Sequence, residues 1–258
     1  MAKEKLLLVK VGGKVVENPE ALNQLITDLS KLSGRKVLVH GGGVMATKTA
    51  SALGIATTMV DGRRVTDDKM IDVVTMVYAG LVNKRVVCLL QSKGTNAIGL
   101  CGADMNVILS DKRPVTTVDY GWVGDVKKVD GKALSSLIES NVVPVLAPLT
   151  HDGKGHILNT NADTIAAETA KGLAPFYDVT LVFCFEKKGV LRDATDDDSV
   201  IPSLNHQDYE ALKEQGVITD GMIPKLDNAF STLQKGVREV VITHAGNLGD
   251  LKEGTHIK

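Results

Sequence analysis

The sequence predicts an α/β fold in which helices cover both faces of a mostly parallel sheet. Short apolar runs alternate along the chain with segments whose apolar residues recur at helical spacing. Hydrophobic residues make up 43% of the 258 residues and aromatic residues only 3%, so the core consists mainly of Val, Leu, Ile and Ala. This composition suits strands that are buried on both faces.

The apolar pattern places the elements in order. Asn18 and Pro19 are typical of the N-cap and first position of a helix, and Gly54 is typical of a helix end. Gly80 could interrupt the longest helix. From the N-terminus we expect a strand at 5–13, a helix at 18–32, a strand at 35–40, helices at 44–53 and 69–94, strands at 97–100 and 142–148, a helix at 162–173, a strand at 179–185, a helix at 227–236 and a closing strand at 238–245.

Two segments depart from this alternation. Residues 104–130 are rich in turns and read as a hairpin insertion rather than a strand–helix–strand unit. Residues 193–200 form an acidic run, which we expect to be a solvated loop and not a metal site. If the chain has two lobes, the boundary falls near 172–178, which divides it into residues 1–175 and 176–258.

Charge and composition exclude several classes of function. The net charge is −1, with 30 basic and 31 acidic residues, so neither a nucleic-acid partner nor a membrane surface is indicated. The apolar run near the N-terminus is too short for a signal peptide or a membrane span. The sparse cysteines predict reduced, mostly buried thiols in a cytoplasmic protein, and no protein-bound metal. They are Cys88, Cys101 and Cys184.

Glycine loops follow two of the predicted strands, as "VKVGGK" at 9–14 and "VHGGGV" at 39–44. Glycine at the carboxyl end of a parallel strand lets backbone N–H groups approach an anion, and a following helix N-terminus favours negative charge. Neither loop matches the Walker pattern or the dinucleotide fingerprint, so a P-loop NTPase and an NAD-dependent oxidoreductase are both disfavoured.

Three charged side chains lie where structure alone does not require them. Lys10 interrupts an apolar strand immediately before a glycine pair. Pro224 suits the start of a helix after an Asp220-Gly221 turn, and Lys225 in its first turn would oppose the helix dipole. Asp163 stands in "LNTNAD", where either Asn161 or Asp163 could cap the next helix.

The ordered motifs of the chain resemble those of the amino acid kinase family, and within it the branch that acts on N-acetylated glutamate. The resemblance extends over nearly the whole chain. Its motifs are Lys10 with Gly12-Gly13, "HGGG" at 40–43, "GRRVTD" at 62–67, "LNTNAD" at 158–163, "ITDGMIPK" at 218–225 and "GTHI" at 254–257.

The resemblance implies a three-layer αβα sandwich built as two lobes. Residues 1–175 would bind the acylglutamate and form a homodimer, and residues 176–258 would bind ATP. The reaction would transfer the γ-phosphoryl group of ATP, whose phosphates carry Mg²⁺, to the side-chain carboxylate of an N-acyl-L-glutamate, in arginine biosynthesis. Because a carboxylate is already ionised at pH 7, no general base is required, and His40 is expected to be structural.

The family's residue roles carry over to matching positions. Lys10 and Lys225 would stabilise the transition state, and Asp163 would hold both lysines in place. The remaining positions are Gly12 and Gly13 for phosphate, Gly42, Gly43, Arg64 and Asn159 for the acylglutamate, and Glu186, Lys187, Lys188, Gly189, Val190, Leu191, Val217, Ile218 and Thr219 for ATP.

Departures from the family leave alternatives open. Glu186 replaces the usual aspartate of the nucleotide motif, and Lys187 and Lys188 add positive charge there. The extra N-terminal helix of arginine-inhibited relatives is absent, which predicts no inhibition by arginine through such a helix. The acyl group could be acetyl or succinyl, and Arg63, if it does not simply point to solvent, could bind the extra carboxylate of a succinyl group. Another kinase of the family or a non-catalytic regulatory relative also remains open.

Overall fold

A mostly parallel sheet forms the centre of the molecule in a computed structural model that describes residues 3–193, 195–219 and 222–258. The sheet has eight strands in the order β12-β14-β13-β11-β1-β2-β8-β5, and the β13–β14 pair is antiparallel. These strands are β1 (Lys5–Val11), β2 (Arg35–His40), β5 (Ala97–Leu100), β8 (Val143–Leu146), β11 (Asp178–Phe185), β12 (Ser203–Leu204), β13 (Glu239–His244) and β14 (Thr255–Ile257).

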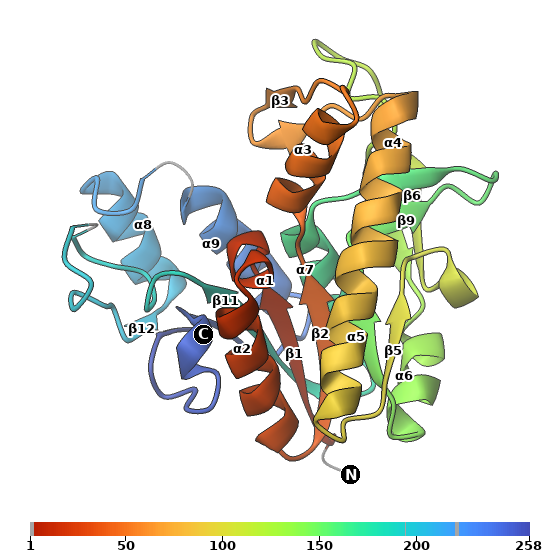
Figure 1. Ribbon diagram of the computed structural model, residues 1–258. Coiled ribbons are helices and arrows are strands. Elements are labelled where there is room, and N and C mark those ends of the chain that lie inside the picture. Colours follow the sequence, from red (N-terminus) through yellow and green to blue (C-terminus); the bar gives the residue numbers. More distant parts are fainter. Residues whose placement is uncertain (1–2, 194, 220–221) are drawn as a thin grey trace.

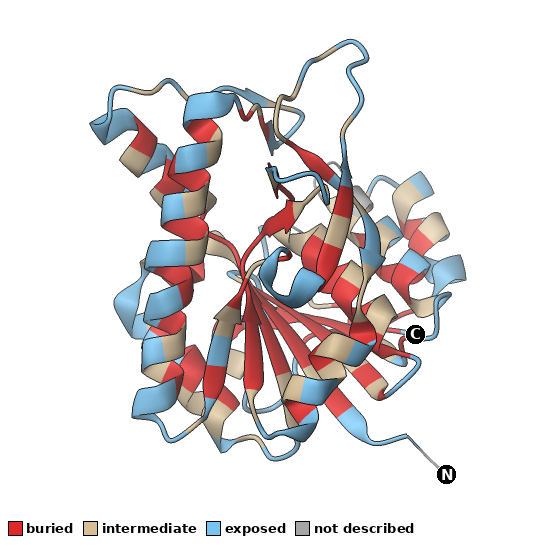
Figure 2. Cartoon of the chain, turned by 90° about the vertical axis from the view of Figure 1, so that its right-hand side faces the viewer, coloured by how far each residue is buried: buried red, intermediate tan, exposed pale blue. Residues whose placement is uncertain are grey.

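Helices cover both faces of this sheet, so the predicted αβα sandwich is confirmed (Figure 1). One face packs against α1 (Gly13–Glu17), α2 (Pro19–Lys31), α3 (Gly43–Ala52), α4 (Asp68–Thr75) and α5 (Asn83–Ser92). The other packs against α6 (Gly131–Glu139), α7 (Ala162–Leu173), α8 (His206–Glu214) and α9 (Ile223–Leu233). Most of the sheet is buried between these two layers (Figure 2).

The alternation of side chains along the strands assigns each residue to one face. In β1, Leu6 and Leu8 belong to the core under α6–α9, whereas Val9 and Val11 belong to the core under α1–α5. The period of two therefore places Lys10 on the α6–α9 face. By the same rule, His40 at the end of β2 lies on the α1–α5 face.

A smaller sheet lies beyond the carboxyl ends of the central strands. Its order is β10-β9-β6-β7, and β6 and β7 pair antiparallel, so the predicted hairpin at 104–130 is confirmed. The sequence did not predict the other strands of this region or its small hairpin β3–β4. The elements are β3 (Met59–Val60), β4 (Arg63–Arg64), the short helix η2 (Asp104–Asn106), β6 (Ile108–Lys112), β7 (Gly124–Val129), β9 (Leu149–His151) and β10 (Ile157–Asn159).

The long helix predicted at 69–94 runs over Asp68–Ser92, and the interruption expected near Gly80 is instead a π-helical stretch, η1 (Met76–Val82). By length and a mean hydropathy of 1.6 this helix could cross a membrane. Its buried side chains, however, belong to the core under α1–α5, which is the position of a core helix in a globular protein. The long apolar run is therefore explained by packing against the sheet.

Other differences from prediction concern short or polar elements. The chain ends in β14, after the short helix η4 (Ala245–Asn247), and not in the strand predicted to close the sheet. Helix α9 begins at Ile223, earlier than 227, so Lys225 does lie in the first turn. The proposed Asp220-Gly221 turn lies outside the described residues. The three thiols are free, as predicted, but only Cys184 is buried and Cys88 is exposed.

The cap of α2 offers a test of local stability. The Asn18 side chain accepts hydrogen bonds from the N–H groups of Glu20 and Ala21, at 3.0 and 3.1 Å. We expect Asn18→Ala to lower the free energy of unfolding by about 1 kcal/mol, measured by urea denaturation. Asn23→Ala, at an exposed position within the same helix, is the matched control. It should be neutral or slightly stabilising, and equal losses for both variants would contradict the capping role.

Candidate active site

Two glycine turns meet at the carboxyl ends of the neighbouring strands β1 and β2. The Gly41 N–H donates to the Val11 carbonyl at 3.1 Å, and the Gly12 N–H donates to the Cys184 carbonyl at 3.2 Å. A Cβ on Gly41 would lie only 3.0 Å from the Gly13 nitrogen. The two turns therefore touch through their backbones, and a side chain at Gly41 would separate them.

The place where the turns meet gathers backbone N–H groups. Helix α3 begins at Gly43 with Gly42 as its N-cap, so its first N–H groups have no acceptor within the helix. A Cβ on Gly13 would lie 3.5 Å from the Gly42 nitrogen and 3.7 Å from the Gly43 nitrogen. The arrangement suits an anion at this point, because the helix N-terminus adds a favourable dipole.

A cavity of about 300 Å³ opens beside the "HGGG" turn. It contains the predicted acylglutamate residues Gly42, Gly43, Arg64 and Asn159 together. The lining also includes Met59 from the small hairpin, Val123 from the segment before β7, and Tyr78 from the long helix, which the sequence did not single out. These contacts depend on the tertiary fold, and no local pattern marks them.

Arg64 is held in a fixed orientation at the wall of this cavity. Its guanidinium donates to the Gly43 carbonyl at 2.8 Å and to the Thr47 hydroxyl at 2.9 Å, both on α3. Thr66 links Arg64 to Asn159: its hydroxyl donates to the Arg64 carbonyl at 3.0 Å and accepts from the Asn159 amide at 2.9 Å. A fixed guanidinium is suited to grip a carboxylate.

A second cavity, of about 370 Å³, lies on the side of the turns nearer α9. Lys10, Asp163 and Lys225 all line it. Lys10 is almost fully buried, and its ammonium pairs with the Asp163 carboxylate at 2.6 Å. Asn161 supplies the cap of α7 by accepting from the Asp163 and Thr164 N–H groups, which leaves the Asp163 carboxylate free for Lys10.

Phe185 contacts both lysines, an arrangement that the sequence did not predict. The Lys225 ammonium is 4.0 Å and the Lys10 ammonium 5.0 Å from the centre of its ring. Burial, and to a lesser extent the charge of Lys10, lowers the pKa of Lys225, whereas Asp163 and Glu186 oppose that shift. Lys10 and Lys225 thus both lie near Asp163, and a nearby anion would oppose the lowered pKa of Lys225.

The two cavities share the turn that follows β1. Gly13 and Lys14 line both of them, and Gly12 lines the second. The Lys14 ammonium pairs with the Glu186 carboxylate at 2.8 Å, across the opening of the second cavity. Lys14 is a further residue that sequence reasoning missed, because a lysine after two glycines has no distinctive pattern.

The predicted nucleotide residues are divided between this cavity and its surroundings. Glu186, Lys187 and Gly189 line it. Val190 and Ile218 are buried in the core, and the Val190 N–H donates to the Thr255 hydroxyl at 2.8 Å. The positions outside the cavity lining, whose role in binding ATP stays a prediction, are Lys188, Val190, Leu191, Val217, Ile218 and Thr219.

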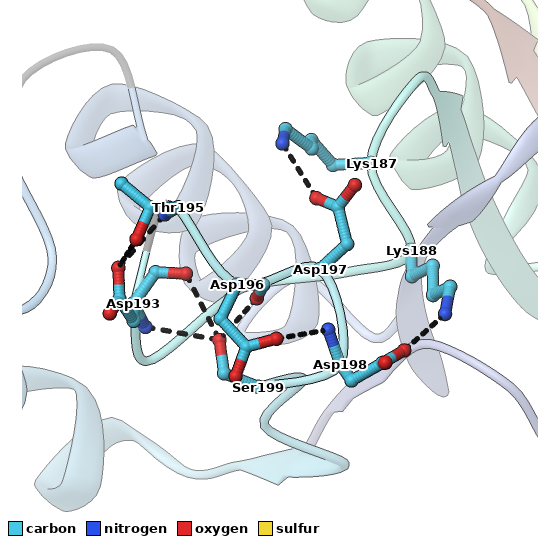
Figure 3. Close-up of polar contacts among 8 residues, drawn as sticks. All are labelled: Lys187, Lys188, Asp193, Thr195, Asp196, Asp197, Asp198 and Ser199. Atoms are coloured by element: carbon cyan, nitrogen blue, oxygen red, sulfur yellow. Dashed lines mark hydrogen bonds and ion pairs between the residues drawn. The ribbon is translucent and has the colours of Figure 1, made fainter.

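The acidic run pairs with the extra lysines of the nucleotide motif (Figure 3). Lys187 pairs with Asp197 at 2.6 Å, and Lys188 pairs with Asp198 at 2.5 Å. The aspartates of this loop are exposed, as predicted, but two of them are bound to lysines as well as to solvent. Within the described parts of the chain, no group of three or more His, Cys, Asp or Glu side chains could hold a metal ion.

His40 is the last residue of β2, just before the three glycines of the turn, and it lies outside both cavity linings. It is completely buried. The pKa of its imidazole is lowered to about 4, mainly by burial; the hydrogen bond to the Gly41 carbonyl opposes this shift, and the charge of Lys84 contributes to it. The ring is therefore neutral at pH 7, which agrees with the expected structural role.

Known proteins match this chain over almost its whole length. Residues 5–244 match the amino acid kinase family, which confirms the resemblance seen in the motifs. The acetylglutamate kinase of Bacteroides thetaiotaomicron is 61% identical over 99% of this chain and 99% of its own length. That of Cytophaga hutchinsonii is 54% identical over 96% of this chain and 94% of its own.

Among solved structures, the N-acetylglutamate synthase of Neisseria gonorrhoeae, complexed with coenzyme A and N-acetyl-glutamate, aligns with a TM-score of 0.82. It is 23% identical, and the alignment covers 98% of this chain and 59% of that chain. At this identity the likeness shows a shared fold, and it confirms the predicted architecture.

The shifted pKa of His40 predicts a pH-dependent stability. The pKa is about 4 in the folded chain and 6.5 when the ring is free, so the unfolded chain binds the extra proton between these values. Stability therefore falls as the pH drops from 6.5 to about 4, by roughly 3 kcal/mol in total, and this contribution is constant at lower pH. Urea denaturation of the wild type and His40→Asn across this range tests it. The wild type should lose more stability than the variant, and parallel curves would contradict the prediction.

Proposed function

Since the chain belongs to the amino acid kinase family, we propose that it transfers the γ-phosphoryl group of ATP to the side-chain carboxylate of N-acetyl-L-glutamate. The products are N-acetyl-L-glutamyl phosphate and ADP. The names of relatives at 54–61% identity over nearly their full length support this substrate. The acyl phosphate belongs to arginine biosynthesis.

The observation that carries the proposal is the meeting of two cavities at one glycine turn. A carboxylate acceptor fits the cavity that contains Arg64 and Asn159, and a nucleotide fits the cavity that contains Lys10 and Lys225. Gly13 lines both, so a phosphoryl group could pass from one to the other beside its N–H group. The phosphoryl donor and the acceptor would thus occupy separate cavities, and both could reach the glycine N–H groups.

In the proposed reaction a carboxylate oxygen of the acylglutamate attacks the γ-phosphorus in line with the bond that breaks. The P–O bond to the β-phosphate breaks, and its electron pair leaves on ADP, so no proton has to move. Negative charge spreads over the equatorial oxygens, and catalysis is mainly positioning and charge stabilisation. Lys10 and Lys225 would supply the charge, and the amides around Gly42 and Gly13 would bind the oxygens.

The roles of the two parts of the chain follow from this assignment. We propose that residues 1–175 hold the acylglutamate and that residues 176–258 contribute most of the ATP site. The boundary falls between α7 and β11, although β11 pairs with β1 over seven residues. Mg²⁺ would enter with the ATP phosphates and screen their charge. Asp163 and Glu186 are the carboxylates of the nucleotide cavity, and Lys10 and Lys14 already pair with them.

One observation supports a substrate with a different acyl group. Arg63 lines the acylglutamate cavity beside Arg64 and is itself exposed. A succinyl group would bring a second carboxylate to this wall, and Arg63 is the side chain that could bind it. N-succinyl-L-glutamate is therefore the alternative substrate.

We also propose that the protein is a cytoplasmic homodimer. Its use of ATP and its three free thiols support the location. Met76 and Leu81 on the long helix, and Ile98 on the edge strand β5, are more than one third exposed, which supports an interface on this side. Sedimentation equilibrium would test it: a dimer that Leu81→Asp converts to monomer supports the assignment, and a monomeric wild type contradicts it.

The substrate assignment is tested by ADP release from MgATP with four acceptors in parallel: N-acetyl-L-glutamate, N-succinyl-L-glutamate, free L-glutamate and L-aspartate. We expect turnover with N-acetyl-L-glutamate and none with the free amino acids. If the succinyl compound is preferred and Arg63→Ala removes that preference, the alternative holds. If no acceptor reacts while ATP still raises the melting temperature, the proposed activity is wrong.

The two-lysine mechanism predicts a loss of kcat. Lys225→Ala and Lys10→Ala should each lower kcat by at least about 100-fold with much smaller changes in KM, because each lysine would act on charge that develops in the transition state. Steady-state kinetics with both substrates measures this. Lys235→Ala, at an exposed lysine just after α9, is the control and should keep wild-type rates. A Lys225→Ala variant with normal kcat would contradict the mechanism.

A further inference from the structure

Next to the glycines at 41–43, two buried polar side chains contact each other and lie outside both cavity linings. His40 is completely buried and Asn83 is 1% exposed. The His40 ring is hydrogen-bonded on one side to the Gly41 carbonyl and on the other to the Asn83 amide. We propose that His40 and Asn83 form a relay that orients the Gly41–Gly42 peptide for phosphoryl transfer, which makes His40 a positioning residue. This role rests on the proposed function.

The contacts allow only one arrangement of protons. His40 Nδ1 lies 2.8 Å from the Gly41 carbonyl oxygen, which can only accept, so Nδ1 carries the hydrogen. In the neutral ring Nε2 then accepts from Asn83 Nδ2, at 3.1 Å. The same Nδ2 donates its other hydrogen to the Val145 carbonyl at 2.9 Å, and Asn83 Oδ1 accepts from Lys84 at 3.2 Å. Each polar atom of the relay has a partner.

The relay acts on a peptide plane that glycine would otherwise leave free. Because a trans peptide is planar, its C=O and N–H groups point in opposite directions. The Gly41 carbonyl points toward His40, so the Gly42 N–H points away from it. Gly13, which lines both cavities, is close to this nitrogen: its ideal Cβ position is 3.5 Å from it. Holding the Gly41 carbonyl thus aims the Gly42 N–H at the place where the two cavities meet.

The orientation of this peptide must be fixed by contacts with other residues. Glycine reaches alternative φ/ψ regions at little cost, and the flanking residues of this peptide are both glycine. A reversed Gly41–Gly42 peptide would direct a carbonyl oxygen, not an N–H group, toward the incoming anion. Positioning errors of about 1 Å can cost on the order of 100-fold in rate, so a group that fixes this plane affects kcat without touching substrate.

The long helix anchors the relay. Asn83 is the first residue of α5, immediately after the π-helical stretch Met76–Val82. The same stretch supports Gly42, because a Cβ there would lie 2.9 Å from the Tyr78 ring. On the other side, Gly99 of β5 makes room for Asn83: a Cβ on Gly99 would lie 1.7 Å from Asn83 Oδ1. The relay can therefore be disturbed from an edge strand that does not line either cavity.

Two substitutions of His40 distinguish a role in orienting the Gly41–Gly42 peptide from a role in filling the core. An asparagine amide can replace Nδ1 as donor to Gly41, whereas a glutamine can replace Nε2 as acceptor for Asn83 but loses the Gly41 contact. We expect His40→Asn to keep kcat within about 10-fold and His40→Gln to lower it about 100-fold, with little change in KM for either substrate. If the two variants lose kcat equally, or if His40→Gln is the more active, the relay does not position the peptide.

Gly99→Ala tests the same relay from a distance. The new methyl group must displace the Asn83 side chain, so kcat should fall by about 10-fold or more while KM stays nearly constant. Gly249→Ala is the matched control, since a Cβ there would have only ordinary contacts with Asp28 at 3.9 Å. It should leave the rates unchanged. A Gly99→Ala enzyme that is folded, by urea denaturation, and fully active would overturn the relay.

Nitrogen NMR of the His40 ring tests the relay without any activity. With ¹⁵N-labelled histidine we expect one neutral tautomer, protonated at Nδ1, in the wild type at pH 7. Protonation at Nε2 would overturn the proposed relay even if the enzyme is active. Conversely, the expected tautomer in a protein that phosphorylates no acylglutamate would show that the relay exists and that the proposed function is wrong.

Discussion

The close contact between two glycine turns is the constraint on which the rest of the site depends. A Cβ on Gly41 would lie 3.0 Å from the Gly13 nitrogen, so the turns after β1 and β2 meet backbone to backbone. Parallel pairing of these two strands brings both turns to the same edge of the sheet. Because no side chain intervenes, two cavities can share one wall of N–H groups. The proposed donor and acceptor sites are therefore adjacent as a consequence of strand pairing.

The two faces of the sheet contribute different components to this edge. The α6–α9 face carries the Lys10–Asp163 pair and Lys225, since Lys10 comes from β1, Asp163 from the start of α7 and Lys225 from the start of α9. The α1–α5 face carries the neutral support, with His40 at the end of β2 and Asn83 at the start of α5. This division follows from side-chain alternation in the strands, because adjacent residues such as Val9 and Lys10 must face opposite layers. Lys10 and His40 therefore extend from opposite faces of the sheet.

The sequence alone predicted those features whose pattern lies in consecutive residues. Strand β2 and helix α7 match their predicted ranges, since apolar runs and caps are written in consecutive residues. It also named Lys10 and Lys225, because each breaks a local rule, and Asp163, because its motif resembles that of the family. It failed for Lys14, Phe185 and Thr66, whose importance comes from contacts with distant segments: Lys14 pairs with Glu186, 172 positions away. It also misjudged Gly80, because a π-helical stretch over Met76–Val82 keeps the helix continuous there.

The two lysines of the second cavity differ in their charge partners. Lys10 has a carboxylate partner at 2.6 Å, but Lys225 lies over the Phe185 ring, and burial together with Lys10 lowers its pKa. Its position in the first turn of α9 also places it against the helix dipole. An anion near the two lysines would raise the pKa of Lys225 and offset its unfavourable interaction with the helix dipole. Both effects would be strongest when the negative charge on that anion is greatest. In the proposed reaction, Lys225 would therefore stabilise a phosphoryl group in transfer more than the bound substrates, which would raise kcat and not merely affinity.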